Sequence, residues 1–508
     1  MNAIALGSDG FYHPGDEAEI CQLVQYANLR GLKIRVRGAG HSVASAIYTH
    51  RPRTHQTHDG GLNLMLDKMY KVTFDDARMQ VTVQGGCHLG KDPSDPTQTS
   101  TEKNSLFYQL DQRGWALPTT GGIIHQTVAG FLATGSAGGT LMHSLGEHIV
   151  AIRVVDGTGM VHELAKDKDR DKFYAAGVSL GLLGIITAVT FQCVEKFHVM
   201  GQETTTKIAD CKVDLFGAGR GADRPSLQAF LESTEHARLL WWPQQGVEKV
   251  TVWEAHNMQA EDYTAQTGTP EDFKPQPYQQ FPRIFGSDSL AQVLAGLFYR
   301  MPAFLQKLLV APAINLFSST VGEGGTQKFW DTWWKVLPMD NRLSDKWIPY
   351  EFSELWIPIS KTLEVVRKLC DHYRNSGFQA TRALPCEIYV KKKSPFWMNP
   401  AYQQDVVRIN LFWFGRNKQD PVTSYFPQFW QLLQAFDYRL HWGKYLPADP
   451  SEYLRSRYPK WDDFMKIRAE MDPNQIFVSD YWRTRLGIDT KTTFSAASSK
   501  TQGSAVRL

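Results

Sequence analysis

The pattern of apolar and polar residues changes near residue 195, from short helix and strand patterns with glycine turns to strands separated by longer loops. Near the start, apolar residues recur at helical spacing between positions 16 and 30. This segment predicts an amphipathic helix whose buried face carries Ile20, Leu23, Val24 and Ala27. Asp16 and Glu19 suit the N-terminus of the helix, and Gly31 suits its end.

Strands and turns dominate the rest of this first part. Lys33–Arg37 alternates as a strand, and Thr101–Gln112 predicts a helix that ends before Gly114. Two hairpins are predicted, one from Tyr70–Phe74 with Met79–Val83 and the other from Ile149–Val155 with Met160–Leu164.

From about residue 196 the loops become longer and tryptophan becomes abundant, which indicates a second domain. Its strands alternate as half-buried antiparallel strands do, and the clearest are Arg238–Trp242, Val250–Glu254 and Val407–Phe414. The aromatic side chains have two interpretations, since they could stack on a sugar or simply form the core. The residues concerned are Trp241, Trp242, Trp253, Trp330, Trp333, Trp334, Trp347 and Trp356.

A glycine turn follows the first predicted strand and reads Arg37-Gly38-Ala39-Gly40-His41-Ser42. Glycine lets backbone N–H groups approach an anion closely, so the turn is either a plain turn or a phosphate site with His41 beside it. A nicotinamide-dinucleotide fingerprint fits worse, because Val43 and Ala44 stand where a further glycine is expected.

A second glycine-rich segment spans residues 120–139. Its glycine density predicts a loop rather than a stable helix. Apolar residues such as Val128, Phe131 and Leu132 indicate that this loop is buried, and its N–H groups then need acceptors. A large polar cofactor would supply them.

Four motifs occur in a fixed order: GAGHS at 38–42, GGIIHQTVAGFLATGSAGG at 121–139, VSLGLLGIITAVTFQCV at 178–194, and HWGK at 441–444. Together they closely resemble the FAD-binding proteins of the vanillyl-alcohol-oxidase type. Within that group they resemble the sugar-lactone and alditol oxidoreductases, which include gulonolactone, galactonolactone, arabinonolactone and alditol oxidases. The resemblance is strong over 10–195 and 436–487 and faint between them.

The resemblance implies an α+β fold in several parts. Residues 1–195 would form a PCMH-type FAD-binding domain of two α+β subdomains, and 196–435 an antiparallel-sheet substrate (cap) domain. The segment 436–487 would return to the flavin, and 488–508, rich in Ser, Thr, Ala and Lys, would be a disordered tail.

The resemblance also assigns the cofactor residues. His41 would form a covalent bond to the 8α-methyl group of the flavin ring of FAD. This would be the one covalent linkage, because the second glycine segment holds no cysteine. Relatives usually read GTHG where this chain has Gly135-Ser136-Ala137-Gly138. The backbone N–H groups of the loop can still contact the cofactor, but the histidine of that motif is absent. The implied cofactor contacts are Arg37, Gly38, Ala39, Gly40, His41, Ser42, Gly122, Thr127, Val128, Thr134, Gly135, Ser136, Ala137, Gly138, Gly139, Ile185, Ile186, His441 and Lys444.

For catalysis the resemblance implies Glu354, Glu387, Lys444 and Thr127. Lys444 would stabilise the reduced flavin, and Thr127 would lie near the flavin ring. His441 would either contact the cofactor or only pack against its own loop. The apolar setting of Glu354 predicts a raised pKa and a role as base, whereas Lys391–Lys393 should keep Glu387 ionised as a binding group.

Two departures bear on the substrate. Relatives often carry arginine where this chain has Trp356 and Tyr389. Without those cations a lactone carbonyl is less favoured, and a less polar alcohol becomes credible.

The function predicted is therefore a covalent-FAD oxidoreductase that oxidises a CH–OH group of a sugar lactone, alditol or related alcohol, with oxygen or another acceptor. The alternatives are a nicotinamide-dependent flavin reductase of the same superfamily and a non-catalytic carbohydrate-binding flavoprotein. The HWGK ending disfavours the reductase. The aromatic second domain and the two missing arginines suggest the binding protein.

Charge and composition narrow the partners. A net charge of +3 gives no basic field for nucleic acid. Six scattered cysteines without CxxC spacing predict reduced thiols in the cytoplasm and no metal site. The stretch Leu290–Phe317 is interrupted by charges and prolines, so it predicts a buried helix or one in peripheral contact with a membrane. Residues 50–58 are expected to form an exposed loop.

Overall fold

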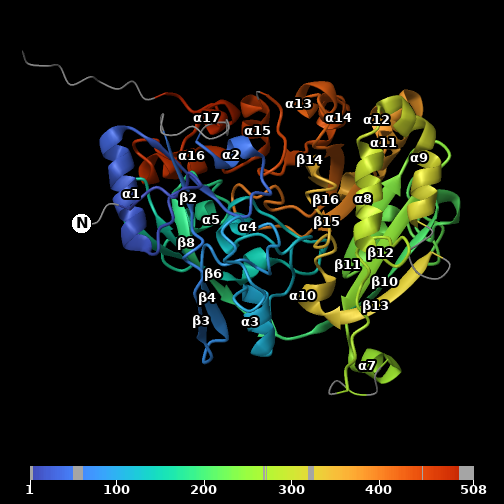
Figure 1. The fold of residues 1–508 in the computed structure, drawn as a ribbon, viewed down its shortest axis with the longest axis horizontal. Coiled ribbons are helices and arrows are strands. Elements are labelled where there is room, and N and C mark those ends of the chain that lie inside the picture. The colour runs from blue at the N-terminus through green and yellow to red at the C-terminus, as the bar shows by residue number, and fades with distance from the viewer. Residues whose placement is uncertain are drawn as a thin grey trace, which may run out of the picture.

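The structure is a computed structural model that describes residues 4–49, 61–266, 269, 272–318, 325–448 and 450–490. It is a mixed helix and sheet fold in two parts that lie next to each other, the N-terminal part at the left of Figure 1 and the second part at the right. The expected loop at 50–58 and nearly all of the expected tail lie outside the described residues.

The N-terminal part is built around small sheets. Its helices are α1 (Glu17–Arg30), α2 (Ala44–Ile47), α3 (Leu106–Gln112), α4 (Val128–Ala133) and α5 (Arg170–Ala176). Its strands are β1 (Lys33–Arg37), β2 (Gly61–Met65), β3 (Val72–Asp75), β4 (Gln80–Gln84), β5 (Trp115–Ala116), β6 (Ile149–Val155), β7 (Val161–Ala165), β8 (Ile185–Gln192) and β9 (Val194–Glu195). β1 and β2 pair in parallel, and an antiparallel sheet has the order β3-β4-β8-β6-β7.

The predicted first helix is confirmed in detail. Asp16 caps α1 by accepting a hydrogen bond from the Glu19 N–H, and Gly31 ends the helix with φ +65°. The strand β1 and both hairpins are confirmed within one or two residues of the expected bounds.

Two predictions in this part need correction. The helix expected from Thr101 begins only at Leu106, because residues 101–105 form turns. The second glycine segment was expected to lack a helix, yet α4 forms within it. Thr127 caps this short helix by accepting from the Gly130 N–H, and burial of Val128, Phe131 and Leu132 outweighs the low helix propensity of glycine.

The second part contains most of the remaining elements. Its strands are β10 (His198–Lys207), β11 (His236–Trp242), β12 (Lys249–Asn257), β13 (Thr326–Thr332), β14 (Tyr350–Pro358), β15 (Cys386–Lys391) and β16 (Val406–Phe414). Its helices are α6 (Leu227–Ser233), α7 (Ala260–Gln266), α8 (Asp288–Tyr299), α9 (Ala303–Ser318), α10 (Trp333–Val336), α11 (Thr362–Ser376), α12 (Phe378–Thr381), α13 (Pro421–Ser424) and α14 (Pro427–Leu433).

These strands form an antiparallel eight-stranded sheet with the order β13-β10-β12-β11-β15-β16-β14-β17, where β17 is Arg439–Leu440. The antiparallel arrangement was predicted, but the half-buried alternation was not met: β16 is buried everywhere except at Phe412. Helix α11 covers one face, with Tyr373 against Trp241, and the other face lines a cavity. One face of the sheet therefore packs on a helix, and the other faces the cavity.

The C-terminal segment joins the two parts. β17 pairs with β14, and then α15 (Ser451–Arg457), α16 (Trp461–Met471) and α17 (Asp480–Leu486) lie beside the N-terminal elements in Figure 1. The Ile34 N–H donates to the Ile476 carbonyl at 2.7 Å, and the indole N–H of Trp482 donates to the Ala46 carbonyl at 3.0 Å. The segment thus fixes the cap sheet relative to the glycine turn.

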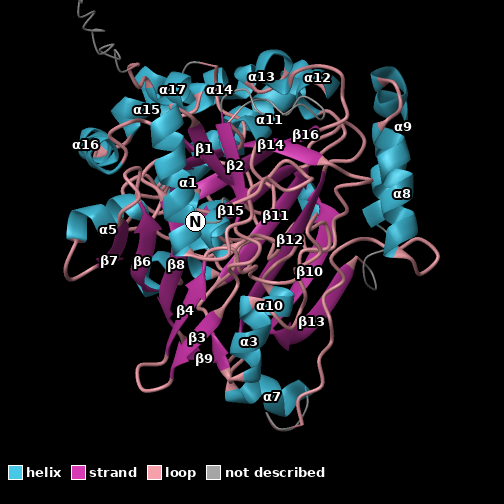
Figure 2. Ribbon diagram, turned by 60° about the vertical axis from the view of Figure 1, so that its left-hand side comes forward, coloured by secondary structure: helices cyan, strands magenta, loops and turns pink. Residues whose placement is uncertain are grey.

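The stretch Leu290–Phe317 forms two helices, α8 and α9, rather than one. Arg300, Met301 and Pro302 separate them, and Pro312 lies inside α9. Figure 2 shows both along one flank of the eight-stranded sheet. Across the described residues, none of the helices combines the length and the apolar character needed to span a membrane.

Candidate active site

The glycine turn at the end of β1 faces the N-terminus of α4. Gly40 adopts φ +87°, and a Cβ on Gly38 would lie 2.6 Å from the Thr127 Oγ1. Only glycine fits both demands, namely a left-handed backbone and a close approach. Residues 37–42 all line a small cavity of about 120 Å³ between β1, α4 and β8.

The other predicted cofactor residues divide between cavities and packing positions. Thr127, Thr134, Ile185 and Ile186 line the small cavity. Gly122, Thr134, Ser136, Ala137, His441 and Lys444 line a large cavity next to it. Val128 is buried in the core, and Gly135 lines a separate minor cavity. Gly138 and Gly139 make close approaches, because a Cβ there would lie 2.3 Å and 2.4 Å from backbone carbonyl oxygens.

Several lining residues of the small cavity were not singled out from the sequence. Gly181 and Gly184 belong to the third motif and have φ +65° and +147°, so their glycine character carried a signal. Gly85 and Gly86 follow a predicted strand and give a similar signal. Trp442 and Trp482 close the cavity from the C-terminal segment, which only the fold reveals.

His41 lies where the two cavities meet. Both cavities are lined by Gly40, His41, Ser42, Gln126 and Thr134. The His41 Nε2 atom is buried and has no hydrogen-bond partner among the described residues. Burial, together with the charges of Lys444 and Arg37 and nearby histidines, lowers the pKa of His41 to about 3, so the imidazole is neutral. An unpartnered, neutral nitrogen beside a glycine cradle fits the edge of a bound FAD.

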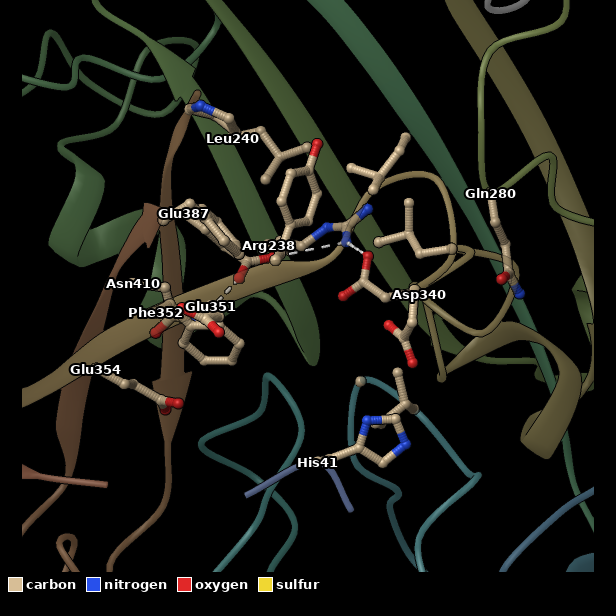
Figure 3. A pocket seen from close by; sticks show the side chains of 18 of the residues that line it. His41, Arg238, Leu240, Gln280, Asp340, Glu351, Phe352, Glu354, Glu387 and Asn410 are labelled. Atoms are coloured by element: carbon tan, nitrogen blue, oxygen red, sulfur yellow. Dashed lines mark hydrogen bonds and ion pairs between the residues drawn. The ribbon is translucent and has the colours of Figure 1, made fainter. Parts of the chain in front are cut away.

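The large cavity, of about 730 Å³, lies between this cradle and the eight-stranded sheet. Figure 3 shows His41 on one side and Glu354, Glu387, Arg238 and Asp340 on the other. Apart from Glu351 of β14, the lining residues of β11, β14, β15 and β16 alternate along each strand, as the two-residue period of a strand requires. They are Arg238, Leu240 and Trp242 of β11, Tyr350, Phe352 and Glu354 of β14, Glu387 and Tyr389 of β15, and Arg408, Asn410 and Phe412 of β16.

Glu354 is held as an ionised partner of Arg408. The Arg408 Nε donates to the Glu354 Oε1 at 2.6 Å, and both side chains are buried. Burial opposes ionisation of Glu354, but Arg408, His441 and Lys444 outweigh it and lower its pKa. The raised pKa expected for Glu354 is therefore wrong, because the sequence did not reveal that Arg408 lies opposite on β16.

Glu387 has the opposite shift. Burial and the neighbouring Asp340 raise the pKa of Glu387 to about 7, despite Arg238 at 3.6 Å and a hydrogen bond from the Asn410 amide at 2.8 Å. The expectation that three lysines would keep it ionised is also wrong. Those lysines lie about 13–20 Å farther along the strand direction, and one of them, Lys392, pairs with Glu147 at 3.0 Å.

Two arginines of the sheet bring positive charge to the large cavity. The Arg408 guanidinium lies 4.8 Å from the ring centre of Trp356 and 4.9 Å from that of Tyr389, the two positions where relatives often carry arginine. Arg238 donates to the Asp340 carboxylate at 2.7 Å from β11. Sequence reasoning missed both, although a buried charge within a predicted strand is a usable signal.

The HWGK turn places Lys444 at the glycine turn. The Lys444 Nζ donates to the His41 carbonyl at 3.0 Å and lies 4.1 Å from the ring centre of Phe352. Burial lowers the pKa of Lys444 to about 8, although Glu354 favours its charge. His441 is buried, its Nδ1 accepts from the Gly443 N–H at 3.1 Å, and burial lowers its pKa to about 4. Its ring also lines the large cavity and lies 6.2 Å from the ring centre of Trp356.

Thr127 lies on the side of the small cavity. Its hydroxyl caps α4 and is absent from the lining of the large cavity, so its position favours the cofactor over the substrate. Its catalytic role stays a prediction.

Of the eight tryptophans singled out, Trp242 lines the large cavity, while Trp241, Trp253, Trp333 and Trp356 are fully buried, so they mostly form the core.

Comparison with known proteins identifies the family to which the chain belongs. Residues 189–485 match the family model described as D-arabinono-1,4-lactone oxidase, and residues 8–91 match that of an FAD binding domain. An L-gulono-1,4-lactone dehydrogenase of Mycobacterium tuberculosis is 25% identical over 93% of this chain and 95% of its own length. An alditol oxidase of Streptomyces is 24% identical over 73% of this chain and 76% of its own.

Among solved structures, a cholesterol oxidase from Brevibacterium sterolicum has a TM-score of 0.71 with 14% identity and 94% coverage of both chains. That likeness shows the fold of a PCMH-type FAD-binding domain with an antiparallel-sheet domain. The first family model covers more than half of the chain. The chain therefore belongs to the D-arabinono-1,4-lactone oxidase family and is an FAD-dependent oxidoreductase.

Proposed function

We propose that this protein oxidises a CH–OH group of a sugar lactone, alditol or related alcohol, using FAD bound covalently to His41. The observation that carries the proposal is the facing arrangement across the large cavity. A neutral His41 with an unpartnered nitrogen lies on one side, and a carboxylate whose pKa is raised to about 7 lies on the other. A base with such a pKa is suited to accept a proton at neutral pH.

The chemistry divides between the cofactor and the side chains. FAD held by the glycine turn and His41 would supply the acceptor for the hydride from the carbinol carbon, and oxygen or another acceptor would take up the two electrons afterwards. Glu387 takes the hydroxyl proton as the C–O bond becomes a carbonyl. Asn410 and Arg238 hold its carboxylate through the contacts at 2.8 Å and 3.6 Å. This assignment exchanges the roles expected for Glu387 and Glu354.

Lys444 supplies a fixed positive charge at the His41 turn, in a site that burial partly shields from water. Such a charge stabilises negative charge that hydride transfer delivers nearby. The ionised Glu354, paired with Arg408, instead offers polar contacts to the rest of the substrate head. Thr127 and the glycine turn would hold the cofactor through hydrogen bonds and close backbone approach.

Anaerobic bleaching of the flavin tests the proposal. The purified protein would be mixed with γ-lactones of sugars, alditols and aryl alcohols, and oxygen would then be admitted. We expect at least one CH–OH donor to bleach the flavin, and the rate of recolouring to separate an oxidase from a dehydrogenase. Bleaching by NADH or NADPH alone would favour the flavin reductase, and bleaching by neither would favour the non-catalytic binding protein.

We also propose that α8 and α9 contact a membrane surface from the cytoplasm. Their outer faces expose large apolar side chains, including Phe304 at 70% and Leu308 at 72%, with the exposed Lys307 between them. An apolar face with flanking cations is typical of helices that lie in a lipid interface. The six free cysteines, all among the described residues, suit a reducing compartment.

A further inference from the structure

We propose that the alcohol oxidised at this site carries a large apolar body, held in a chamber between the eight-stranded sheet and the helices α8 and α9. The inference rests on the function proposed above and names its substrate class. The chamber is the part of the large cavity that lies beyond Glu387 as seen from His41.

The lining of the sheet changes from polar to aromatic along the strands. Strand register places Glu354 opposite Asn410, and Asn410 opposite Glu387, so these three polar groups form one row across β14, β16 and β15. The next row on the same face pairs Phe352 with Phe412. A substrate that enters between the rows therefore meets charges at the reacting end and aromatic rings beyond it.

Strand β11 repeats this change. Its cavity-facing residues run from Arg238 through Leu240 to Trp242, from a buried cation to apolar side chains. Tyr350 continues the aromatic surface on β14. Two steps of two residues at about 3.3 Å per residue separate Glu354 from Tyr350, so the graded surface along β14 is about 13 Å long.

Helices α8 and α9 form the opposite wall. Ala295, Phe298 and Tyr299 of α8 face the chamber together with Ile314 and Phe317 of α9. These residues pack in one hydrophobic cluster with Phe412 and Phe414 of the sheet. The chamber is thus enclosed by apolar side chains on two sides.

Several polar groups in the large cavity are paired within the protein, although the carboxyls of Glu351 and Asp345 also line it. Glu203 accepts from the Tyr278 hydroxyl at 2.6 Å, and the hydroxyls of Thr205 and Thr251 lie 2.9 Å apart. The Gln280 amide donates to a backbone carbonyl at 3.1 Å and accepts from a backbone N–H at 2.9 Å. These groups have little capacity left to recognise a polyhydroxylated molecule.

The polarity of the lining points to the substrate more directly than the volume does. The cavity of about 730 Å³ has to hold the flavin ring beside His41 as well as the substrate, and the apolar residues line the part beyond Glu387. A monocyclic sugar lactone would leave the chamber empty, or would bury hydroxyl groups against rings where nothing pairs with them, which is unfavourable. A fused-ring or long-chain alcohol would fill it.

The first test is a donor series with one reacting group. Cyclohexanol, a decalol, butan-2-ol and dodecan-2-ol would be compared with a sugar γ-lactone in anaerobic flavin reduction. The pairs are cyclohexanol with decalol and butan-2-ol with dodecan-2-ol. We expect the reduction rate divided by the dissociation constant to be at least tenfold higher for the large alcohol of each pair, and to be low for the lactone. If the lactone and small alcohols reduce the flavin as well as the large ones, the inference fails while the proposed function stands. If no donor reduces it, the proposed function fails.

A second test alters the chamber wall. Ala313 lines the chamber on α9, whereas Ala311 on the same helix does not. Ala313→Phe should weaken the binding of decalone and dodecan-2-one, measured by quenching of protein fluorescence, by about 10- to 200-fold. Ala311→Phe is the matched control and should bind them as the wild type does.

Ile314→Gln on α9 gives an independent variant if Ala313→Phe does not fold. It places an amide in the chamber and should lower the affinity for the large ketones while cyclohexanone binds unchanged. Equal loss for small and large ketones, or no loss in either variant, would overturn the inference.

Discussion

Replacing Glu387 by glutamine should slow flavin reduction and remove its pH dependence on the acid side. With a pKa of about 7, the wild-type carboxyl is half ionised at pH 7. At pH 5 only about one carboxyl in a hundred is ionised, so the wild-type rate should be about fiftyfold lower there than at pH 7. Loss of a positioned base commonly costs about 10²–10⁴-fold, and Glu387→Gln should show a loss of that order at pH 7.

The assay is anaerobic stopped-flow reduction from pH 5 to pH 9, with the limiting rate divided by the dissociation constant plotted against pH. Glu354→Gln is the matched control, because Glu354 is equally buried but ionised beside Arg408. It should weaken substrate binding and keep the acid limb. The reasoning is refuted if Glu387→Gln keeps the acid limb, or if Glu354→Gln is the variant that loses it.

Three further predictions follow from the same geometry. Acid precipitation of the wild type should leave yellow, fluorescent flavin in the pellet, whereas His41→Ala should release it; free flavin from the wild type would contradict the covalent bond. Lys444→Ala should keep flavin but slow reduction about a hundredfold, and should lose the decline that the wild type shows above about pH 8, where Lys444 loses its proton; an unchanged rate and alkaline limb would exclude this role. Leu308→Glu should abolish flotation with vesicles of phosphatidylcholine and phosphatidylserine, while Leu29→Glu on α1, whose side chain is 85% exposed, should float as the wild type does; equal flotation of both variants would remove the membrane proposal.

Local features were predictable where the chain determines them over a few residues. The cap, the buried face and the end of α1 follow from Asp16, the apolar spacing and Gly31, and the structure confirms each. The glycine turn that lines the small cavity was predictable because Gly38, Gly40 and His41 lie within four residues of one another. The short helix α4 was not, because its stability comes from burial of Val128 and Phe131 in tertiary packing.

The acid–base properties of the site depended on contacts between distant residues. Glu354 and Arg408 belong to different strands, and only their neighbouring positions in the sheet bring them to 2.6 Å. Asp340 comes from a loop after α10 and raises the pKa of Glu387 across the cavity. A charged side chain within a strand can be recognised from the sequence. The neighbouring group that shifts its pKa can be identified only when the strand register and the course of the loops are known.

The central claim is that a CH–OH donor passes hydride to a flavin held at His41 while Glu387 removes the hydroxyl proton. Its most direct measurement is the anaerobic reductive half-reaction with a donor alcohol carrying either protium or deuterium at the carbinol carbon. The account predicts bleaching of the bound flavin that deuterium slows several-fold in the wild type. Bleaching by NADH or NADPH, with none from any alcohol, would contradict it.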